Sequence, residues 1–181
     1  MRVISGQYRG RVLKGFELKG TRPTMDRVKE SLFAMLQPYL EGSCCLDLFA
    51  GSGNLGIEAL SEGARQVVFV DHNKEACQTV KENLKSLTID SKGTVIREDY
   101  QKALASFSSA SFDLIFLDPP YQTDYLSKAL KNIASYQLLK DRGMIVLESD
   151  DLKKMNFDST YYSLWKEKKY GDKYIRILQK K

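Results

Sequence analysis

The chain has 181 residues, 43% of them hydrophobic, which suits one domain with a core of ordinary size and leaves little room for a second catalytic domain. It opens without the apolar run of a signal peptide and has no stretch of membrane-spanning length, so we expect a soluble cytoplasmic protein. One histidine argues against a histidine-dependent hydrolase or a metal site of several histidines, and three cysteines are too few for a disulfide framework.

Charge differs between the ends and the middle of the chain. The net charge is +5, but residues 1–30 and residues 166–181 are each net +5, so the middle of the chain is net −5. Basic segments on either side of an acidic body predict that the two ends form a surface for a polyanion. Basic termini that are merely solvated are the alternative.

The first 40 residues are expected to form a small extension in front of the main fold. Residues 2–18 look like short strands interrupted by glycines, which favours a β-hairpin. Thr24 is placed to cap a helix that ends before Pro38. The apolar residues of that helix form one stripe: Val28, Leu32, Met35 and Leu36.

The rest of the chain alternates between two patterns. Short apolar runs rich in β-branched and aromatic residues predict buried parallel strands at 44–49, 66–70, 94–96, 112–117 and 143–147. Stretches with helical periodicity lie between them, at 55–62, 74–87, 101–107 and 124–139. This alternation predicts a doubly wound α/β sheet with helices on both faces.

The last part of the chain has a different pattern. Runs at 161–165 and 174–178 flank a polar turn that contains Gly171 and Asp172, which predicts a closing antiparallel hairpin. The expected fold is therefore a mostly parallel, seven-stranded, Rossmann-like sheet in a single domain, 1–181. Within it, residues 41–181 are expected to form the core that binds the cofactor.

The loop after the first predicted strand carries a glycine pattern typical of nucleotide-binding sites. Gly51, Gly53 and Gly56 match G-x-G-x-x-G, and Asp71 ends the second strand 20 residues after Gly51. These features also suit an NAD-dependent oxidoreductase. Asp47 favours S-adenosylmethionine instead, because a carboxylate here would repel a pyrophosphate and attract a cationic methionine group.

The end of the third predicted strand supplies another candidate for the same site. Asp99 lies where a carboxylate can accept hydrogen bonds from the adenine amino group, although an aspartate at this position can equally cap the following helix. The predicted cofactor-binding residues are Asp47, Phe49, Ala50, Gly51, Gly53, Asn54, Asp71, His72, Asp99, Tyr100 and Asp118.

The most specific local motif directly follows the fourth predicted strand. Two prolines remove backbone donors and stiffen this loop, so its carbonyls are expected to face a ligand. The Asp118 carboxylate and the Pro119 carbonyl can accept both hydrogens of an amino group, while Tyr121 can stack on a flat base. A proline turn that caps the next helix is the alternative. The predicted catalytic residues are Asp118, Pro119, Pro120 and Tyr121.

With these residues placed, the whole chain resembles the ribosomal RNA small-subunit guanine-N2 methyltransferases of the RsmD type, within the class-I methyltransferase superfamily. The segments that carry the resemblance are 2–6, 9–11, 22–33, 46–53, 55–60, 118–121 and 170–171. The resemblance implies methyl transfer from S-adenosylmethionine, leaving S-adenosylhomocysteine, to N2 of one guanine in 16S ribosomal RNA, within a small ribosomal subunit or its assembly intermediate. It also implies that the basic N-terminal extension binds RNA, through Arg9, Arg11, Arg22, Thr24 and Arg27.

Other functions explain less of the sequence. A DNA or other RNA amino-methyltransferase acting on adenine N6 or cytosine N4 shares the loop at 118–121, but the DNA enzymes normally need an additional target-recognition segment. An NAD-dependent oxidoreductase leaves that loop unexplained, and a non-enzymatic RNA-binding module explains only the basic ends. We expect a monomer, because no sustained heptad or exposed apolar stripe is evident, and we expect neither a metal site nor membrane association.

Overall fold

The computed structural model describes residues 1–15, 26–121 and 123–181. Its strands form one seven-stranded sheet in the order β3-β2-β1-β4-β5-β7-β6. Strands β1 to β5 pair in parallel, whereas β7 is antiparallel to both of its neighbours, which confirms the predicted sheet and closing hairpin. The strands are β1 (Cys44–Asp47), β2 (Gln66–Asp71), β3 (Gly93–Arg97), β4 (Phe112–Leu117), β5 (Leu139–Ser149), β6 (Tyr162–Tyr170) and β7 (Lys173–Lys180).

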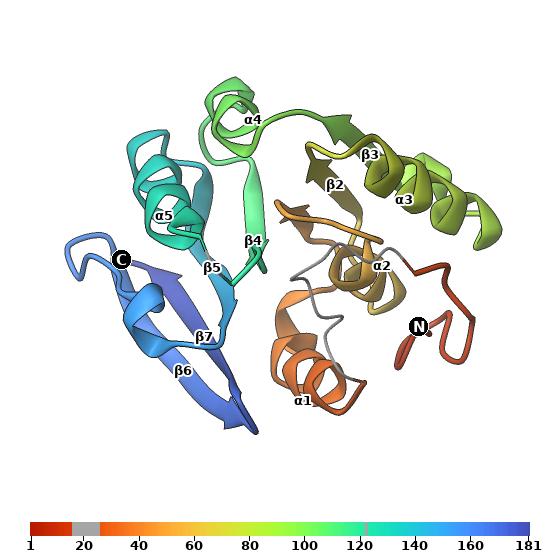
Figure 1. Cartoon of the computed structure of the whole chain (residues 1–181), viewed down its shortest axis with the longest axis horizontal. Coiled ribbons are helices and arrows are strands. Elements are labelled where there is room, and N and C mark those ends of the chain that lie inside the picture. Colours follow the sequence, from red (N-terminus) through yellow and green to blue (C-terminus); the bar gives the residue numbers. More distant parts are fainter. Residues whose placement is uncertain (16–25, 122) are drawn as a thin grey trace.

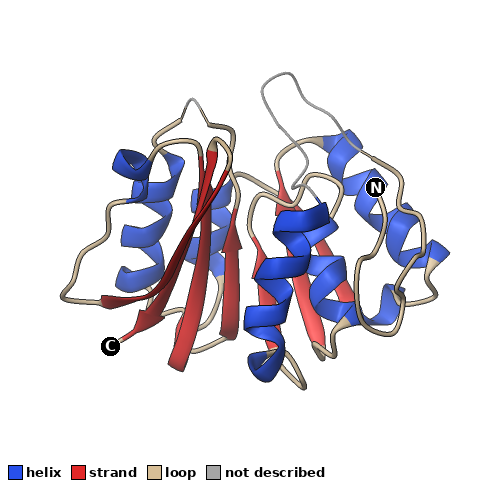
Figure 2. Cartoon of the chain, turned by 90° about the horizontal axis from the view of Figure 1, so that it is seen from below, coloured by secondary structure: helices blue, strands red, loops and turns tan. Residues whose placement is uncertain are grey.

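The sheet lies between two layers of helices, as Figures 1 and 2 show. Helices α1, α2 and α3 cover one face and α4 and α5 cover the other, and each layer buries its own apolar cluster against the strands. None of the described helices is long and apolar enough to span a membrane. The helices are α1 (Asp26–Leu36), α2 (Asn54–Ser61), α3 (Lys74–Ser86), α4 (Tyr100–Ser106) and α5 (Tyr125–Ser135), with 3-10 turns η1 (Gln37–Tyr39), η2 (Asp90–Lys92) and η3 (Leu152–Met155).

The largest departure from the predicted elements lies between α5 and β5. The sequence pattern predicted a helix over 124–139 and a strand over 143–147, but α5 ends at Ser135 and β5 begins at Leu139. Gln137 has a φ of 52°, a left-handed conformation that ends a helix. Leu138 and Leu139 are buried as the chain enters the sheet, so their apolar character reflects the core and not another helical turn.

The N-terminal segment, residues 1–15, packs along helix α2. In place of the expected hairpin strands, the described residues contain an isolated antiparallel bridge between Arg2 and Val12. The Glu58 carboxylate of α2 accepts hydrogen bonds from the backbone N–H groups of Ile4, at 3.0 Å, and Ser5, at 2.8 Å. Because the sheet covers one side of α2 and this segment packs on the helix as well, every residue of the helix is buried.

The two chain termini lie on opposite sides of the molecule in both views (Figures 1 and 2). The surface predicted for the two basic segments therefore does not include both termini, and it stays a prediction for the segments as a whole. Within the described residues, the two basic segments come together between α1 and β6. There the Ser31 hydroxyl oxygen lies 2.5 Å from the Tyr170 hydroxyl oxygen and 3.5 Å from the Lys168 ammonium nitrogen.

Candidate active site

Two loops meet where the sheet changes its direction of winding. From β1 the chain winds outward to β2 and β3, and later continues on the other side of β1 to β4 and β5. Asp47, the last residue of β1, is in register with Phe116 of β4. The glycine loop after β1 (residues 48–53) and the Asp-Pro-Pro-Tyr loop after β4 (residues 118–121) therefore emerge side by side at the carboxyl edge of the parallel strands, where such folds bind ligands.

The glycines of the G-x-G-x-x-G pattern have separate structural tasks. Gly51 has a φ of 55°, and a Cβ built on it would meet nothing within 4 Å, so the backbone is open to a ligand there. A Cβ on Gly56 would lie 2.3 Å from the Phe69 ring, so this glycine lets α2 pack closely on β2. The first glycine thus serves access to the site, and the last serves the packing of the helix that follows it.

Asp47 places a carboxylate beneath the glycine loop. Its side chain is buried, and one carboxylate oxygen accepts a hydrogen bond of 2.9 Å from the Gly56 N–H group in the first turn of α2. Burial, together with the charge of the nearby Asp71 carboxylate, raises the pKa of Asp47 to about 7, although the hydrogen bond from Gly56 acts in the opposite direction. A cation bound close to Asp47 would reverse that shift, because it favours the ionised carboxylate.

Asp71, at the end of β2, also contacts the glycine loop. One of its oxygens accepts a hydrogen bond from the Gly51 N–H group at 3.0 Å, and the other accepts one from the Asn73 N–H group at 2.9 Å. A carboxylate oxygen has two lone pairs, so each oxygen can still accept a further bond, such as one from a ribose hydroxyl. The neighbouring His72 has an exposed side chain, with its Nδ1 3.7 Å from Asp71 Oδ1.

Aromatic rings gather beside this edge of the sheet. Phe49 of the glycine loop packs against Tyr100, with ring centroids 5.2 Å apart, and stacks on Tyr125 at 5.8 Å. Asp99 is exposed and caps α4, because its Oδ1 accepts hydrogen bonds from the N–H groups of Gln101 and Lys102. One oxygen of Asp99 therefore caps the helix, as the alternative interpretation expected. The predicted contact of Asp99 with an adenine amino group stays a prediction.

These features fit S-adenosylmethionine. The open backbone at Gly51 leaves room for a ligand to lie against the loop. The buried Asp47, whose pKa is raised, would be stabilised in its ionised form by the cationic methionine group, whereas the pyrophosphate of NAD would raise that pKa further. The electrostatics of the site therefore favour the cationic cofactor over the anionic one.

The Asp-Pro-Pro-Tyr loop follows β4 directly. Pro119 is buried, and Asp118, Pro120 and Tyr121 are half-buried. The sequence predicted that the carbonyls of this loop face a ligand, but two of them have partners within the protein. The Pro120 carbonyl accepts a hydrogen bond of 2.8 Å from the Thr123 hydroxyl, and the Tyr121 carbonyl accepts one from the Lys154 ammonium. The Asp118 carboxylate and the Pro119 carbonyl stay the predicted acceptors for a substrate amine.

Two residues beside this loop did not emerge from the sequence analysis. Glu148 of β5 and Lys173 of β7 form a buried ion pair, and the Tyr121 hydroxyl donates a hydrogen bond of 3.3 Å to Glu148. Lys173 also lies over the Tyr121 ring, 5.7 Å from its centroid. Glu148 follows the predicted strand at 143–147, so an acid at a strand end was the one available signal, whereas Lys173 is placed by the pairing of β5 with β7.

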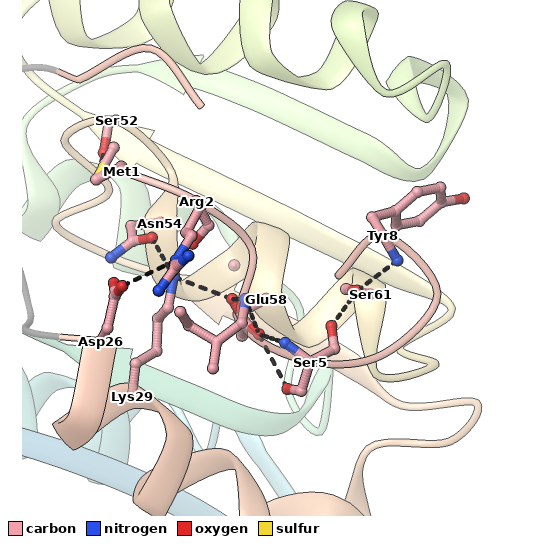
Figure 3. A network of polar contacts seen from close by, with 12 residues as sticks. Met1, Arg2, Ser5, Tyr8, Asp26, Lys29, Ser52, Asn54, Glu58 and Ser61 are labelled. Carbon is pink, nitrogen blue, oxygen red and sulfur yellow. Dashed lines mark hydrogen bonds and ion pairs between the residues drawn. The ribbon is translucent and has the colours of Figure 1, made fainter. Parts of the chain in front are cut away.

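A second buried ion pair supports the glycine loop from the other side (Figure 3). The Lys29 ammonium of α1 lies 3.0 Å from Glu58 Oε2 and donates a hydrogen bond of 2.7 Å to the Asn54 side-chain oxygen. Asn54 is the first residue of α2, directly after Gly53, which caps that helix. Asn54, predicted to bind the cofactor, therefore has its side-chain oxygen occupied by Lys29.

The predicted RNA-binding residues are spread over the N-terminal part of the chain. Arg9 is exposed, and the Arg11 guanidinium donates a hydrogen bond of 2.8 Å to the Ser86 carbonyl at the far end of α3. Arg27 is exposed near the start of α1. Arg22 and Thr24 lie outside the described residues. Because α3 runs from the carboxyl edge of the sheet to the amino edge, Arg11 is distant from the Asp-Pro-Pro-Tyr loop.

Comparison with known proteins places the chain in a family. The family model described as "Conserved hypothetical protein 95" matches residues 1–179. "Ribosomal RNA small subunit methyltransferase D" from Haemophilus influenzae is 38% identical, covering 99% of this chain and 93% of that protein, and the Escherichia coli protein of the same name is 33% identical, covering 99% and 90%. These relatives confirm the resemblance that the sequence motifs indicated.

Solved structures agree with this result. The structure of Escherichia coli yhhF superposes with a TM-score of 0.89 at 31% identity and covers 100% of this chain and 98% of that one. An RNA methyltransferase from Salinibacter ruber in complex with S-adenosyl-L-homocysteine shares the fold, with a TM-score of 0.65 at 14% identity, covering 87% and 93%. The match of the family model across nearly the whole chain and the identity to its relatives show that this protein belongs to the Conserved hypothetical protein 95 family.

Proposed function

We propose that this protein transfers a methyl group from S-adenosylmethionine to the exocyclic N2 amine of a guanine in small-subunit ribosomal RNA. The observation that carries the proposal is the placement of the glycine loop and the Asp-Pro-Pro-Tyr loop on adjacent strands, in a chain that matches small-subunit methyltransferases along its whole length. We further propose that it works as a cytoplasmic monomer on a small ribosomal subunit or its assembly intermediate.

The cofactor is proposed to lie along the glycine loop. Gly51 and Gly53 allow close approach, Asp71 accepts hydrogen bonds from the ribose hydroxyls, and Asp47 attracts the methionine ammonium. When bound, S-adenosylmethionine supplies a methyl group on a positively charged sulfur. The other predicted contacts with the cofactor are Phe49, Ala50, Asn54, His72, Asp99, Tyr100 and Asp118.

The Asp-Pro-Pro-Tyr loop is proposed to orient the guanine amine. This nitrogen is a poor nucleophile, because its lone pair is delocalised into the ring, so positioning must supply much of the acceleration. The Asp118 carboxylate and the Pro119 carbonyl accept the two amine hydrogens, which directs the lone pair toward the methyl group. Tyr121 stacks on the base, and Asp118 or water takes the proton that the amine loses.

RNA binding is proposed to involve the N-terminal extension, residues 1–40, with residues 41–181 as the catalytic core. Arginine contacts with phosphates supply affinity, while the shape of the RNA and the extruded guanine supply specificity. Arg27, on α1, lies close to the place where the two basic segments meet, whereas Arg9 and Arg11 would contact RNA far from the catalytic loop. Replacing Arg9 and Arg11 by alanine should weaken RNA binding at moderate salt and leave cofactor binding unchanged.

The reaction is tested with small ribosomal subunits from a strain that lacks this protein. The protein is incubated with these subunits and S-adenosylmethionine labelled on the methyl group, and the RNA is then digested to nucleosides. Labelled N2-methylguanosine is the expected product. Methylated adenosine or cytidine would keep the chemistry and overturn the guanine substrate, and the absence of transfer to RNA would overturn the proposed function.

The cofactor is tested separately by thermal unfolding. A ligand that binds the native state raises the melting temperature by mass action, so S-adenosylhomocysteine should raise it and NAD should not. A rise with NAD alone would favour the oxidoreductase and would contradict the assignment of Asp47.

A further inference from the structure

Tyr121 is held by charged side chains from three different elements. Its hydroxyl donates to Glu148 of β5, its ring lies beneath Lys173 of β7, and its backbone carbonyl accepts a hydrogen bond from Lys154 of η3. Lys154 is itself tied to Asp150, with Nζ and Oδ1 3.0 Å apart. These contacts restrain both the ring and the backbone of a residue that lies in the catalytic loop.

Lys173 stays charged beside the Tyr121 ring. Burial alone would lower the pKa of Lys173, but the adjacent Glu148 carboxylate raises it above its ordinary value, and the charge of Asp118 acts in the same direction. Burial raises the pKa of Tyr121 to about 12, so its hydroxyl remains protonated and can donate to Glu148. An ammonium therefore faces the Tyr121 ring, which is a favourable cation–π arrangement.

Stabilisation of the folded state is a poor explanation for the buried Glu148–Lys173 ion pair. Glu148 and Lys173 are each 3% exposed in their side chains, so both charges have lost most of their contact with water. Replacing such buried pairs by apolar residues of similar volume is often neutral or stabilising. A buried pair that also contacts a catalytic aromatic residue is better explained by the geometry that it imposes.

We propose that Glu148 and Lys173 are positioning residues for Tyr121, which hold its hydroxyl and so orient the ring for stacking on the target base. The inference rests on the proposed function, because it assumes that Tyr121 stacks on a base during methyl transfer. Glu148 accepts the hydrogen bond of the hydroxyl, and the Lys173 ammonium interacts with the same hydroxyl, so the two residues together fix the rotation of the ring. Lys173 also lies close enough to Asp118 for their charges to attract each other.

A double-mutant cycle on the methyl-transfer rate tests this role. The pair is replaced by apolar residues in the double variant Glu148→Leu/Lys173→Met, in the wild-type background and in the Tyr121→Phe background, which already lacks the hydroxyl. Single-turnover transfer to small ribosomal subunits from the deletion strain should fall about tenfold in the wild-type background. It should fall by no more than about threefold in the Tyr121→Phe background, because the hydroxyl through which Glu148 and Lys173 both act is absent.

Binding of S-adenosylhomocysteine, measured by calorimetry, separates positioning from a general effect on the fold. Its dissociation constant should stay unchanged in the double variant. An equal loss of rate in both backgrounds, an unchanged rate in the wild-type background, or a loss of cofactor affinity as large as the loss of rate would each overturn the inference. If the double variant does not fold, the same cycle is run with Glu148→Gln, which keeps the size of the side chain.

This inference and the proposed function fail in different ways. A wild-type protein that transfers no methyl group to RNA overturns the proposed function. A wild-type protein that is active, together with a cycle that shows no coupling to Tyr121, overturns the positioning role alone. Transfer to an adenine or cytosine amine changes the substrate and leaves the cycle valid, because Tyr121 would stack on any base.

Discussion

Two buried lysine–glutamate pairs flank the candidate active site, and they differ in what they contact. Lys29 and Glu58 join α1 to α2 on the side of the glycine loop, whereas Lys173 and Glu148 join β7 to β5 on the side of the Asp-Pro-Pro-Tyr loop. Each of the four side chains is at most 3% exposed. A buried lysine–glutamate ion pair therefore lies beside each of the two loops.

The Lys29–Glu58 pair joins the N-terminal segment, α1 and α2. An ammonium has three N–H donors, and those of Lys29 reach the Arg2 carbonyl, the Asn54 side chain and the Glu58 carboxylate (Figure 3). Glu58 in turn accepts hydrogen bonds from the N-terminal segment. The second pair contacts the Asp-Pro-Pro-Tyr loop through Tyr121. We therefore expect loss of the first pair to affect mainly stability and loss of the second to affect mainly rate.

Of the changes in the Asp-Pro-Pro-Tyr loop, replacement of Asp118 should lower the methyl-transfer rate most. Replacing Asp118 by alanine should lower the methyl-transfer rate about 10³-fold, because the guanine amine loses the acceptor that orients and deprotonates it. The rate is measured with small ribosomal subunits, and binding of S-adenosylhomocysteine should change by less than about tenfold. Asp124→Ala is the matched control, since Asp124 is an exposed carboxylate that pairs with Lys128 at 2.8 Å. Equal rates for the two variants would remove Asp118 from the reaction.

Of the changes beside the glycine loop, replacement of Lys29 should lower the free energy of unfolding most. Lys29→Met leaves the Glu58 charge buried without its cation, so the free energy of unfolding should fall by about 3–5 kcal/mol. The control is Lys14→Met, which removes an exposed ion pair with Glu82, where the lysine and glutamate side chains are 63% and 41% exposed. That change should cost less than about 1 kcal/mol. Urea unfolding of both variants measures the difference, and similar losses would contradict a special role for the buried pair.

The glycine loop itself separates cofactor binding from stability. Gly51→Ala places a methyl group in the open space where the cofactor is proposed to lie, so affinity for S-adenosylhomocysteine should fall at least about tenfold. Gly10→Ala is matched, because Gly10 also has a positive φ, of 83°, and open space around it, but lies in the N-terminal segment. Both variants should lose similar stability from the left-handed backbone. A similar loss of affinity in both would place the cofactor elsewhere.

Local patterns in the sequence predicted the strands and loops of the site but not the buried Glu148–Lys173 ion pair beside it. The continuous apolar strands, the glycine spacing and the residues after β4 depend on neighbours in the chain, so periodicity and motif spacing locate them. Lys173 and Glu148 are 25 residues apart in the sequence and meet only because β7 pairs with β5. The N-terminal hairpin is shorter than predicted. Residues 1–15 bond to one another through the backbone, as the Val3 N–H group does to the Arg11 carbonyl, but Ser5 and Tyr8 also bond to α2, and sequence spacing does not reveal those contacts.

The two sides of the site should also differ in their response to pH. Lys173 stays charged, because its pKa is raised, whereas Asp47 titrates near neutral pH, because burial raises its pKa to about 7. The methionine ammonium favours ionised Asp47, so affinity for S-adenosylhomocysteine should fall as the pH drops below about 7, by up to about tenfold per unit. Calorimetry from pH 5.5 to 8, a range of about 2.5 units around that pKa, measures the slope.

The stability of the protein without ligand should change with pH in the opposite direction. The folded-state pKa of Asp47 lies above the ordinary value of 3.8, so the folded state holds the proton more tightly than the unfolded chain does. The resulting stabilisation is present below about pH 4 and is lost as the pH rises toward about 7. Asp47→Asn should flatten both dependences. If affinity kept its slope in that variant, the titrating group would lie elsewhere and the Asp47 carboxylate would not be the partner of the cofactor's ammonium.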